Sequence, residues 1–434
     1  MRAQDETRTY NERAINSVGD TVTLQQAEAP YRGGRIFFSI LLVVLILAML
    51  GACAFLMSIF RPPQTGKTDA GIIWIRSIYS INNTMTPSAR VRPASVSFNP
   101  GGRTFWIADA SHARVVEFDI NGRYIHMLTR YTSTEGTSTL FKYPTDIAVG
   151  PDGTLYVCEQ TYNHVLALST SGTLKFTMGV EAPSSVVAGP DMVVVGGKGG
   201  FAAFRRDGTF IGVVGGPGKT DKLFDTVSGL VMDKDENLYV VDTYNNRLSK
   251  YNKKGDRTWI VEMGPPGNGG INLGHNMSSD EIKKKWPSAM QIPTGVAIDG
   301  ANRLIVVDNL DFSIAAFSEK DGKFLAKWGS YGQDDGQLYY PNDIAYDKST
   351  DVFVVTEPQE GRAQIIRLPG SGGTLTADMH RLLGDLPTAC LWPLVFLVVL
   401  LIILLLLRRY FRKRREKAER NDAQNYLEDL LGKR

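Results

Sequence analysis

The chain has 434 residues, of which 43% are apolar, and a formal net charge of +3. This length and apolar content are sufficient for one large core with flanking segments. Residues 408–434 hold ten Lys/Arg against five Asp/Glu, whereas the central part is nearly neutral. We therefore do not expect the central part to bind nucleic acid. Its single cysteine, Cys158, cannot form a disulfide within it and is expected to be buried.

The N-terminal part contains a candidate membrane helix. Residues 1–35 are polar without apolar periodicity, which favours a disordered tail. Residues 36–60 contain no charged side chain, and at about 1.5 Å per residue they can cross a hydrocarbon layer of about 30 Å. We predict a first transmembrane helix here and a linker at residues 61–70. As an alternative, Cys53 ends a sequence similar to a bacterial lipobox and would be acylated, but the apolar run after it favours the uncleaved helix.

A second candidate membrane helix lies near the C-terminus. Residues 371–387 form a predicted linker, and residues 388–407 are apolar enough to cross the membrane. The cations that follow are expected to stay in the cytoplasm and to contact lipid headgroups or a cytoplasmic protein. They are Arg408, Arg409, Arg412, Lys413, Arg414 and Arg415.

Two crossings would place both termini in the cytoplasm and the central part outside it, at the plasma membrane. The basic tail at residues 408–434 also has the pattern of a short amphipathic helix. Such a helix suits a cytoplasmic protein partner.

Residues 71–370 contain six copies of one pattern. Each copy begins with Pro or Val and continues through short apolar runs separated by turns. Spacings of 39 to 66 residues between copies are typical of propeller blades. The runs are rich in Val, Ile, Tyr and Phe, as strands are, so we predict an all-β fold of six four-stranded sheets in a ring. The copies start at Pro93, Pro144, Pro183, Val227, Pro293 and Pro341.

The motif within the copies resembles that of the NHL-repeat six-bladed β-propeller family. Residues 155–159, Leu-Tyr-Val-Cys-Glu, are followed by an Asn-His-Val step, and residues 238–242, Leu-Tyr-Val-Val-Asp, by Asn-Arg-Leu. The resemblance covers residues 70 to 369. It implies a fold and no single ligand, because such propellers serve in protein binding, RNA binding and sensing. The third copy departs most, since residues 193–200 lack the acid and have a Gly-rich turn.

The ring is expected to close through a strand that precedes the first copy. Residues 71–79 have a strand pattern, and the sixth copy has room for only three strands. Supplying its fourth strand from residues 71–79 would remove two open edges.

The longest loops are expected to emerge on one face of the ring. They lie at residues 129–143, 215–226, 264–292 and 329–340. A capping-box pattern at residues 278–281 predicts a short helix in the third of them.

Two sets of residues are candidates for binding. Loops raised on a rigid scaffold often carry function, and the long loops hold seven aromatic side chains, for each of which loop packing is the alternative role. Asp146 and Asp343 open innermost strands and are candidates for a cation or polar-ligand site at the channel mouth, although Asp at such positions also caps turns. The seven aromatics are Tyr131, Phe141, Tyr143, Trp286, Tyr331, Tyr339 and Tyr340.

The sequence contains no recognisable catalytic set. The acids Asp109, Glu159, Asp242 and Asp308 recur at the same place in four of the copies, so we expect them to satisfy backbone N–H groups and not to form a catalytic ring. His164 stands where other copies have arginine, and no two histidines have metal-ligand spacing. We therefore expect no cofactor and no metal.

These patterns favour a membrane-tethered, non-catalytic binding or scaffold module within a cell-envelope assembly. Its loop face would hold a protein or a cell-wall glycan. A first alternative is an enzyme similar to propeller lyases and lactonases, with a channel metal held by Asp146, Asp343 and His112. A second is a sensor ectodomain that signals through a partner.

Overall fold

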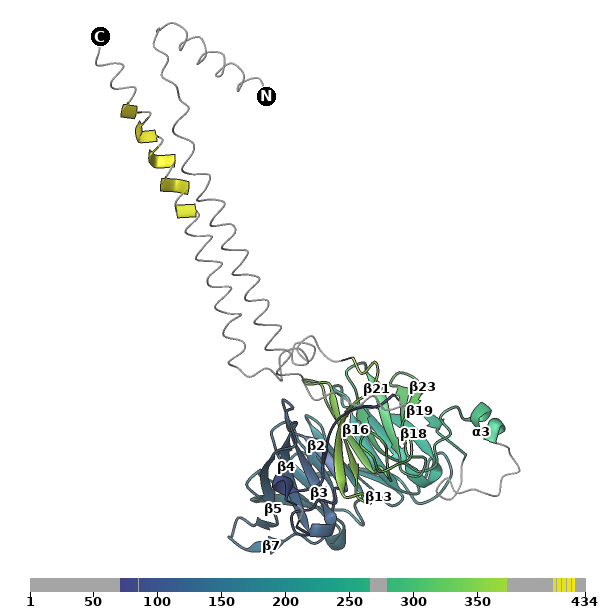
Figure 1. Ribbon diagram of the computed structural model, residues 1–434. Coiled ribbons are helices and arrows are strands. Elements are labelled where there is room, and N and C mark those ends of the chain that lie inside the picture. The colour runs from purple at the N-terminus through teal and green to yellow at the C-terminus, as the bar shows by residue number, and fades with distance from the viewer. Residues whose placement is uncertain are drawn as a thin grey trace, which may run out of the picture. The chain divides into compact units, whose positions relative to one another are not determined.

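The computed structural model describes residues 71–84, 86–265 and 279–372, and residues 409–425 apart from 411, 415, 419 and 423. Within the first three ranges the strands form six four-stranded antiparallel sheets and one two-stranded sheet. The prediction of an all-β propeller with six blades is confirmed. Figure 1 shows these sheets, with β7 and α3 at the periphery.

Each blade runs outward from the ring centre in chain order, except that the last blade takes its outer strand from the start of the chain. Blade one contains β2 (Ser95–Phe98), β3 (Thr104–Asp109), β4 (Arg114–Asp119) and β5 (Tyr124–Leu128). Blade two contains β8 (Pro144–Val149), β9 (Leu155–Glu159), β10 (His164–Leu168) and β11 (Leu174–Gly179). Blade three contains β12 (Ser185–Ala188), β13 (Met192–Gly197), β14 (Gly200–Arg205) and β15 (Phe210–Gly215).

The second half of the ring repeats this order. Blade four contains β16 (Val227–Met232), β17 (Leu238–Asp242), β18 (Arg247–Tyr251) and β19 (Arg257–Glu262). Blade five contains β20 (Pro293–Ile298), β21 (Arg303–Asp308), β22 (Ser313–Ser318) and β23 (Phe324–Trp328). Blade six contains β24 (Asp343–Asp347), β25 (Val352–Glu357), β26 (Arg362–Arg367) and β1 (Ile73–Ile78).

The ring closes as the sequence predicts. Strand β1 pairs antiparallel with β26, with Ile73 opposite Arg367 and Ile78 opposite Ala363. The innermost strands then contact one another around the full circle, from β2 through β8, β12, β16 and β20 to β24 and back to β2. Closure matters because an open ring would expose unpaired strand edges on its first and last blades.

The core lies between the blades. Six clusters of buried apolar side chains fill the six interfaces between neighbouring sheets. The middle strands have a blade on either side, which explains why every residue of β9 is buried, while the outermost β11 alternates. The apolar runs of the sequence are therefore strands covered on both faces.

The third copy forms a complete blade despite its missing acid. A two-residue turn, Lys198 and Gly199, joins β13 to β14. Gly199 has φ +83°, and a Cβ there would lie 2.9 Å from the backbone nitrogen of Pro217. The Gly-rich stretch thus allows close approach of the neighbouring loop.

The two faces of the ring differ in their connections. On one face each second strand meets the third and each blade meets the next; we call it the loop face. The 3₁₀ turns η2 (Ala110–His112), η3 (Gln160–Tyr162) and η4 (Thr243–Asn245) lie on it. So do η1 (Ile81–Asn83), the hairpin of β6 (Arg130–Thr132) and β7 (Ser138–Leu140), and α3 (Ser279–Lys285). The short helix was predicted, whereas the β6–β7 hairpin lies in a segment predicted only as a loop.

Both ends of the propeller chain leave it at the face opposite the loop face. Strand β26 begins at the loop face after β25 and ends at Arg367, opposite Ile73 at the start of β1. Gly372 lies against Ala301, in the hairpin between β20 and β21 on that opposite face. The predicted transmembrane helices at residues 36–60 and 388–407 lie outside the described residues. Within the part of the chain that the structure describes, no helix has the length and hydropathy needed to span a bilayer.

Candidate functional site on the loop face

A buried acid supports the loop face in five of the blades. Asp109 accepts from the backbone N–H of Arg92, Glu159 from Lys142, and Asp242 from Asp225. The same contact joins Asp308 to Gln291 and Glu357 to Tyr339. The acids therefore fasten the links between blades, as expected from their recurrence. Glu357, the acid of the sixth blade, was not singled out from the sequence, although it follows β25 as the others follow their second strands.

Three of these acids are paired with buried arginines that hold the loops above them. Arg114 donates to Asp109 and to the carbonyl of Ser88, and Arg247 donates to Asp242 and to the carbonyls of Thr220 and Leu223. Arg362 bonds Glu357 and the carbonyls of residues 333, 334 and 337. A guanidinium can satisfy several carbonyls at once because it carries five donors. The loops are thus part of the rigid scaffold.

Burial alters the titration of several of these groups. Burial raises the pKa of Glu159, Asp308 and Glu357. Hydrogen bonds from Arg362 to Glu357, and from backbone N–H groups to all three acids, oppose this rise without cancelling it. Burial likewise lowers the pKa of His164, whose ring stacks on Tyr162 at 5.6 Å between centroids. His164 thus packs against the turn in the arginine position.

An aromatic cluster lies on the loop face between blades five and six. Phe312 lies 4.7 Å from Tyr331 and 5.1 Å from Tyr340 between ring centroids. Tyr339 joins the cluster at 5.8 Å from Tyr331 and 4.9 Å from Tyr340. Tyr331 is 64% exposed. Three predicted aromatics therefore do come together, and Phe312, which the sequence reasoning missed, contacts two of them.

The other predicted aromatics do not join this cluster. Tyr131 and Phe141 stack at 5.6 Å and are 9% and 2% exposed, so they hold the β6–β7 hairpin in place. Trp286 is also buried and donates through Nε1 to Glu262 at 2.9 Å. Only Tyr143 is exposed. Packing, the alternative considered for each residue, is what the structure shows for Tyr131, Phe141 and Trp286.

Two exposed tyrosines on the loop face were missed. Tyr162 and Tyr244 lie in η3 and η4 and are 42% and 43% exposed. Both follow the acid of their blade within three residues. The recurrence of a tyrosine in the turn between the second and third strands could have identified both residues from the sequence.

Asp146 and Asp343 lie on innermost strands, as predicted, with Ser95 between them. The Ser95 hydroxyl donates to Asp146, which also accepts from the backbone N–H of Ile147 and Val186. Asp343 accepts from the N–H of Val96 at 3.0 Å. Burial, reinforced by the charge of Asp343, raises the pKa of Asp146 well above its usual range, and burial also raises that of Asp343. The two carboxyl groups thus join adjacent blades.

Glycines occupy the same position of the innermost strand in blades four and five. A Cβ on Gly295 would lie 2.4 Å from Oδ1 of Asp343, and one on Gly229 would lie 2.1 Å from the carbonyl oxygen of Thr294. The strands therefore approach closely where the carboxylates lie. In the described residues no group of three or more His, Cys, Asp or Glu side chains could hold a metal ion.

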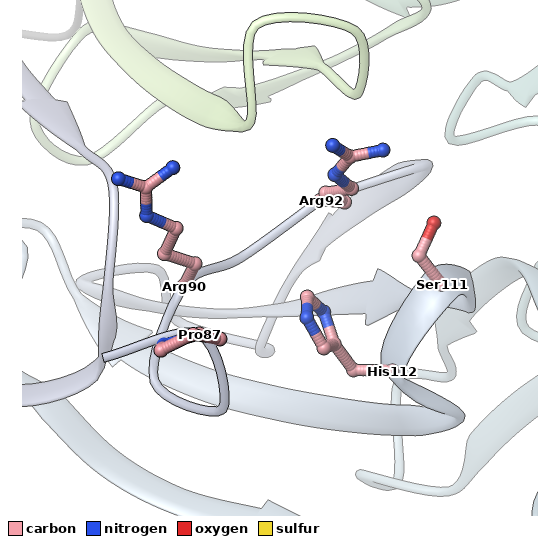
Figure 2. A pocket seen from close by; sticks show the side chains of 5 residues that line it. All are labelled: Pro87, Arg90, Arg92, Ser111 and His112. Atoms are coloured by element: carbon pink, nitrogen blue, oxygen red, sulfur yellow. The ribbon is translucent and has the colours of Figure 1, made fainter. Parts of the chain in front are cut away.

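A depression of about 610 Å³ lies on the loop face beside blade one. Figure 2 shows the guanidinium groups of Arg90 and Arg92 projecting to the same side, with Ser111 and His112 facing them. The fifth lining residue is Pro87. The sequence did not predict this depression. Of its five lining residues only His112 was considered, as a ligand of a channel metal. Its Nδ1 instead lies 2.8 Å from Asp109.

The basic tail is described only in part. Arg409, Arg412, Lys413 and Arg414 are exposed on helical backbone, and Arg412 lies 3.7 Å from Glu416. Arg408 and Arg415 lie outside the described residues.

Cys158, predicted to be buried, is 0% exposed.

Comparisons with known proteins find one family and one relative that match short parts of the chain. The NHL repeat family matches residues 141–166, which include β8 and β9. Protein brain tumor of Drosophila melanogaster is 38% identical over 65 residues, which are 15% of this chain and 6% of that protein. The aligned part is thus a small fraction of that relative.

Solved structures align with about two thirds of this chain at low sequence identity. Hydrazine synthase of Kuenenia stuttgartiensis is 12% identical with a TM-score of 0.46, over 67% of this chain and 99% of that chain. Virginiamycin B lyase from Staphylococcus aureus is 12% identical with a TM-score of 0.45, over 68% and 98%. These similarities carry no argument about activity.

Proposed function

We propose that this NHL-repeat propeller is a non-catalytic binding module, tethered to the plasma membrane, whose loop face holds a protein partner outside the cytoplasm. The aromatic cluster of Phe312, Tyr331, Tyr339 and Tyr340 carries the proposal, because Tyr331 is 64% exposed and the other three rings are half-buried beside it. Exposed aromatic groups on a rigid support are the residues that most often dominate binding energy at protein interfaces. Here the support is the buried pair of Arg362 and Glu357, which bonds the backbone of residues 333–339.

The membrane tether rests on the sequence and on chain connectivity. The two apolar segments, residues 36–60 and 388–407, flank a propeller whose first and last described residues lie on the face opposite the loop face. Attachment at that face leaves the aromatic cluster accessible. The cations after residue 407 favour a cytoplasmic tail that contacts anionic lipid or a cytoplasmic protein.

Crosslinking of intact membranes tests the binding role. Tyr331→Ala combined with Tyr340→Ala should abolish capture of the extracytoplasmic partner, because both rings leave the cluster. The matched control is Phe210→Ala, which removes an aromatic side chain of similar exposure, 57%, from the outer strand β15. Recovery of the protein alone from wild-type membranes, or equal capture by the Tyr double variant, would contradict the proposal. Removal of residues 408–434 in the same experiment tests the tail separately.

A further inference from the structure

We propose that the depression beside blade one binds an acidic peptide segment of a protein partner, through paired contacts to Arg90 and Arg92. This inference deepens the proposed binding function and rests on it. Its basis is two exposed arginine side chains that make no hydrogen bond or ion pair with the described residues, on a backbone that buried groups hold.

Within the described residues, no acidic side chain pairs with Arg90 or Arg92, which lie in the link before blade one. Asp109 is buried, and it is already bonded by Arg114, through Nε at 2.8 Å, and by Nδ1 of His112 at 2.8 Å. Neither the Arg90 nor the Arg92 guanidinium has a hydrogen bond or ion pair among the described residues. Both residues are exposed on the loop face. The site therefore presents two positive charges that the fold itself does not use.

The backbone holds the two arginines at a defined spacing. Val91 between them is 0% exposed and packs in the core between blades six and one. Arg90 and Arg92 are exposed and Val91 is buried, which is the alternation expected of an extended segment. In such a segment the Cα atoms of residues i and i+2 are about 6.5 to 7 Å apart and their side chains point to the same side. The carbonyl of Arg90 is fixed by Arg114, and the N–H of Arg92 by Asp109. Buried groups therefore fix the backbone of both arginines.

This spacing matches an extended acidic peptide. A partner strand with acids at alternate positions presents two carboxylates on one side at the same separation, and each can accept two hydrogen bonds from a guanidinium. Ser111 adds a hydroxyl donor, and His112 adds a second donor at Nε2 when it is protonated. The imidazole is oriented for this by its Nδ1 contact with Asp109.

An isolated phosphate fits the site less well. Phosphate sites in proteins are commonly formed by several free backbone N–H groups at a helix N-terminus or in a nest. Here the N–H of Arg90 bonds the carbonyl of Thr86 and the N–H of Arg92 bonds Asp109. The side chains alone are available, and they form an open depression and not a closed cradle.

The test uses fluorescent peptides and the full chain at low ionic strength. The probe is a Gly/Ser peptide with four glutamates at alternate positions; its controls have the same four glutamates in adjacent positions, or glutamine in their place. The wild-type chain should bind the alternating peptide at least fivefold more tightly than either control. Arg90→Gln combined with Arg92→Gln should weaken that binding at least fivefold. Added salt should do the same, because exposed charges are screened.

Matched variants keep the result interpretable. Arg123→Gln removes an exposed arginine from the hairpin between β4 and β5 on the opposite face and should leave binding unchanged. Thermal unfolding shows whether the Arg90/Arg92 variant is folded, and the Arg90→Lys, Arg92→Lys variant should retain part of the affinity.

The outcomes separate this inference from the proposed function. Equal binding of the alternating and adjacent peptides, unchanged binding by the Arg90/Arg92 variant, or competition by inorganic phosphate at the peptide's own affinity would overturn it. If crosslinking captures a partner that the Arg90/Arg92 variant still holds, the binding function stands and the acidic-peptide site is wrong. If no partner is captured but the peptide binds as expected, the depression is a site while the aromatic cluster is not.

Discussion

At the scale of single residues, a buried acid in five of the six blades holds the backbone of the loop face. Asp242 illustrates the arrangement, since it accepts from the N–H of Asp225, from the Asn245 amide and from Arg247. Arg247 in turn binds the loop carbonyls of Thr220 and Leu223. The acid and the arginine are 1% and 7% exposed. Removing one member leaves a buried charge that water cannot solvate.

Asp242→Asn is therefore expected to lower the free energy of unfolding by about 3 to 5 kcal/mol, as for other broken buried pairs. The measurement is denaturant unfolding of the purified chain. The control is Asp235→Asn, whose partner Lys234 is exposed at the surface, and its effect should stay below about 0.5 kcal/mol. Equal effects of the two variants would show that the buried pair has no special role.

The carboxyl pair of Asp146 and Asp343 predicts a pH effect with a defined sign. Burial raises the pKa of both groups in the folded chain, so the folded state binds protons that the unfolded state releases. Their contribution to stability is largest below the unfolded pKa of about 3.9. It decreases as the pH rises from there through the raised pKa of the pair.

Asp146→Asn should accordingly flatten the fall in unfolding temperature between acidic and neutral pH. Thermal unfolding across that range, compared with wild type, measures the difference, and Asp221→Asn at an exposed loop position is the control. A slope unchanged in Asp146→Asn would mean that the pair titrates normally.

At the scale of elements, the innermost strands of neighbouring blades are closely packed. The strands β16, β20 and β24 approach so closely that blades four and five have Gly229 and Gly295 where blades two and six have Asp146 and Asp343. Bulges in β8, β16 and β20 accompany this narrowing. The residue type at this position, Asp, Ser or Gly, thus depends on the space between neighbouring innermost strands.

Gly295→Ala should destabilise the propeller by about 1 to 3 kcal/mol, as overpacked cores do. Its Cβ would meet the side chain and Cα of Asp343, at 2.4 and 2.6 Å. Gly212→Ala is the matched control, because a Cβ at that position of β15 meets nothing within 4 Å. Thermal unfolding of both variants decides the matter, and a neutral Gly295→Ala would show that the ring can expand.

At the scale of the whole molecule, the ends of the propeller and its exposed loop residues lie on different faces. The first and last described residues of the propeller lie at one face, and the exposed tyrosines and the Arg90/Arg92 depression lie on the other. This division suits a module that is held from one side and binds on the other. It also allows the proposed orientation to be tested without knowledge of any ligand.

Protease added to sealed cells should digest the propeller and spare the basic tail. The reason is that the charges after residue 407 favour the cytoplasmic side. Immunoblotting against tags placed at residue 434 and in the loop around residue 135 reads out both compartments, and permeabilised cells provide the control in which both tags are lost. A protected propeller with a trimmed tail would reverse the proposed orientation.

The repeat pattern alone determined the number of blades, the closure by residues 71–79 and the structural role of the recurring acids. These follow from local periodicity and from the need to bury two faces of every sheet. The exposure of individual loop side chains could not be predicted in this way. Tyr131 and Tyr331 both lie in long loops, yet one is buried and the other is 64% exposed.

Only the tertiary structure decided which side chains are available to a partner. Asp109 could have paired with Arg90, Arg92, His112 or Arg114, all of which are near it in sequence. In the folded chain Asp109 pairs with Arg114 and His112. The side chains of Arg90 and Arg92 are exposed. The physical reason is that partner choice and exposure depend on packing between segments that meet only when the ring closes, and sequence spacing contains no record of those distances.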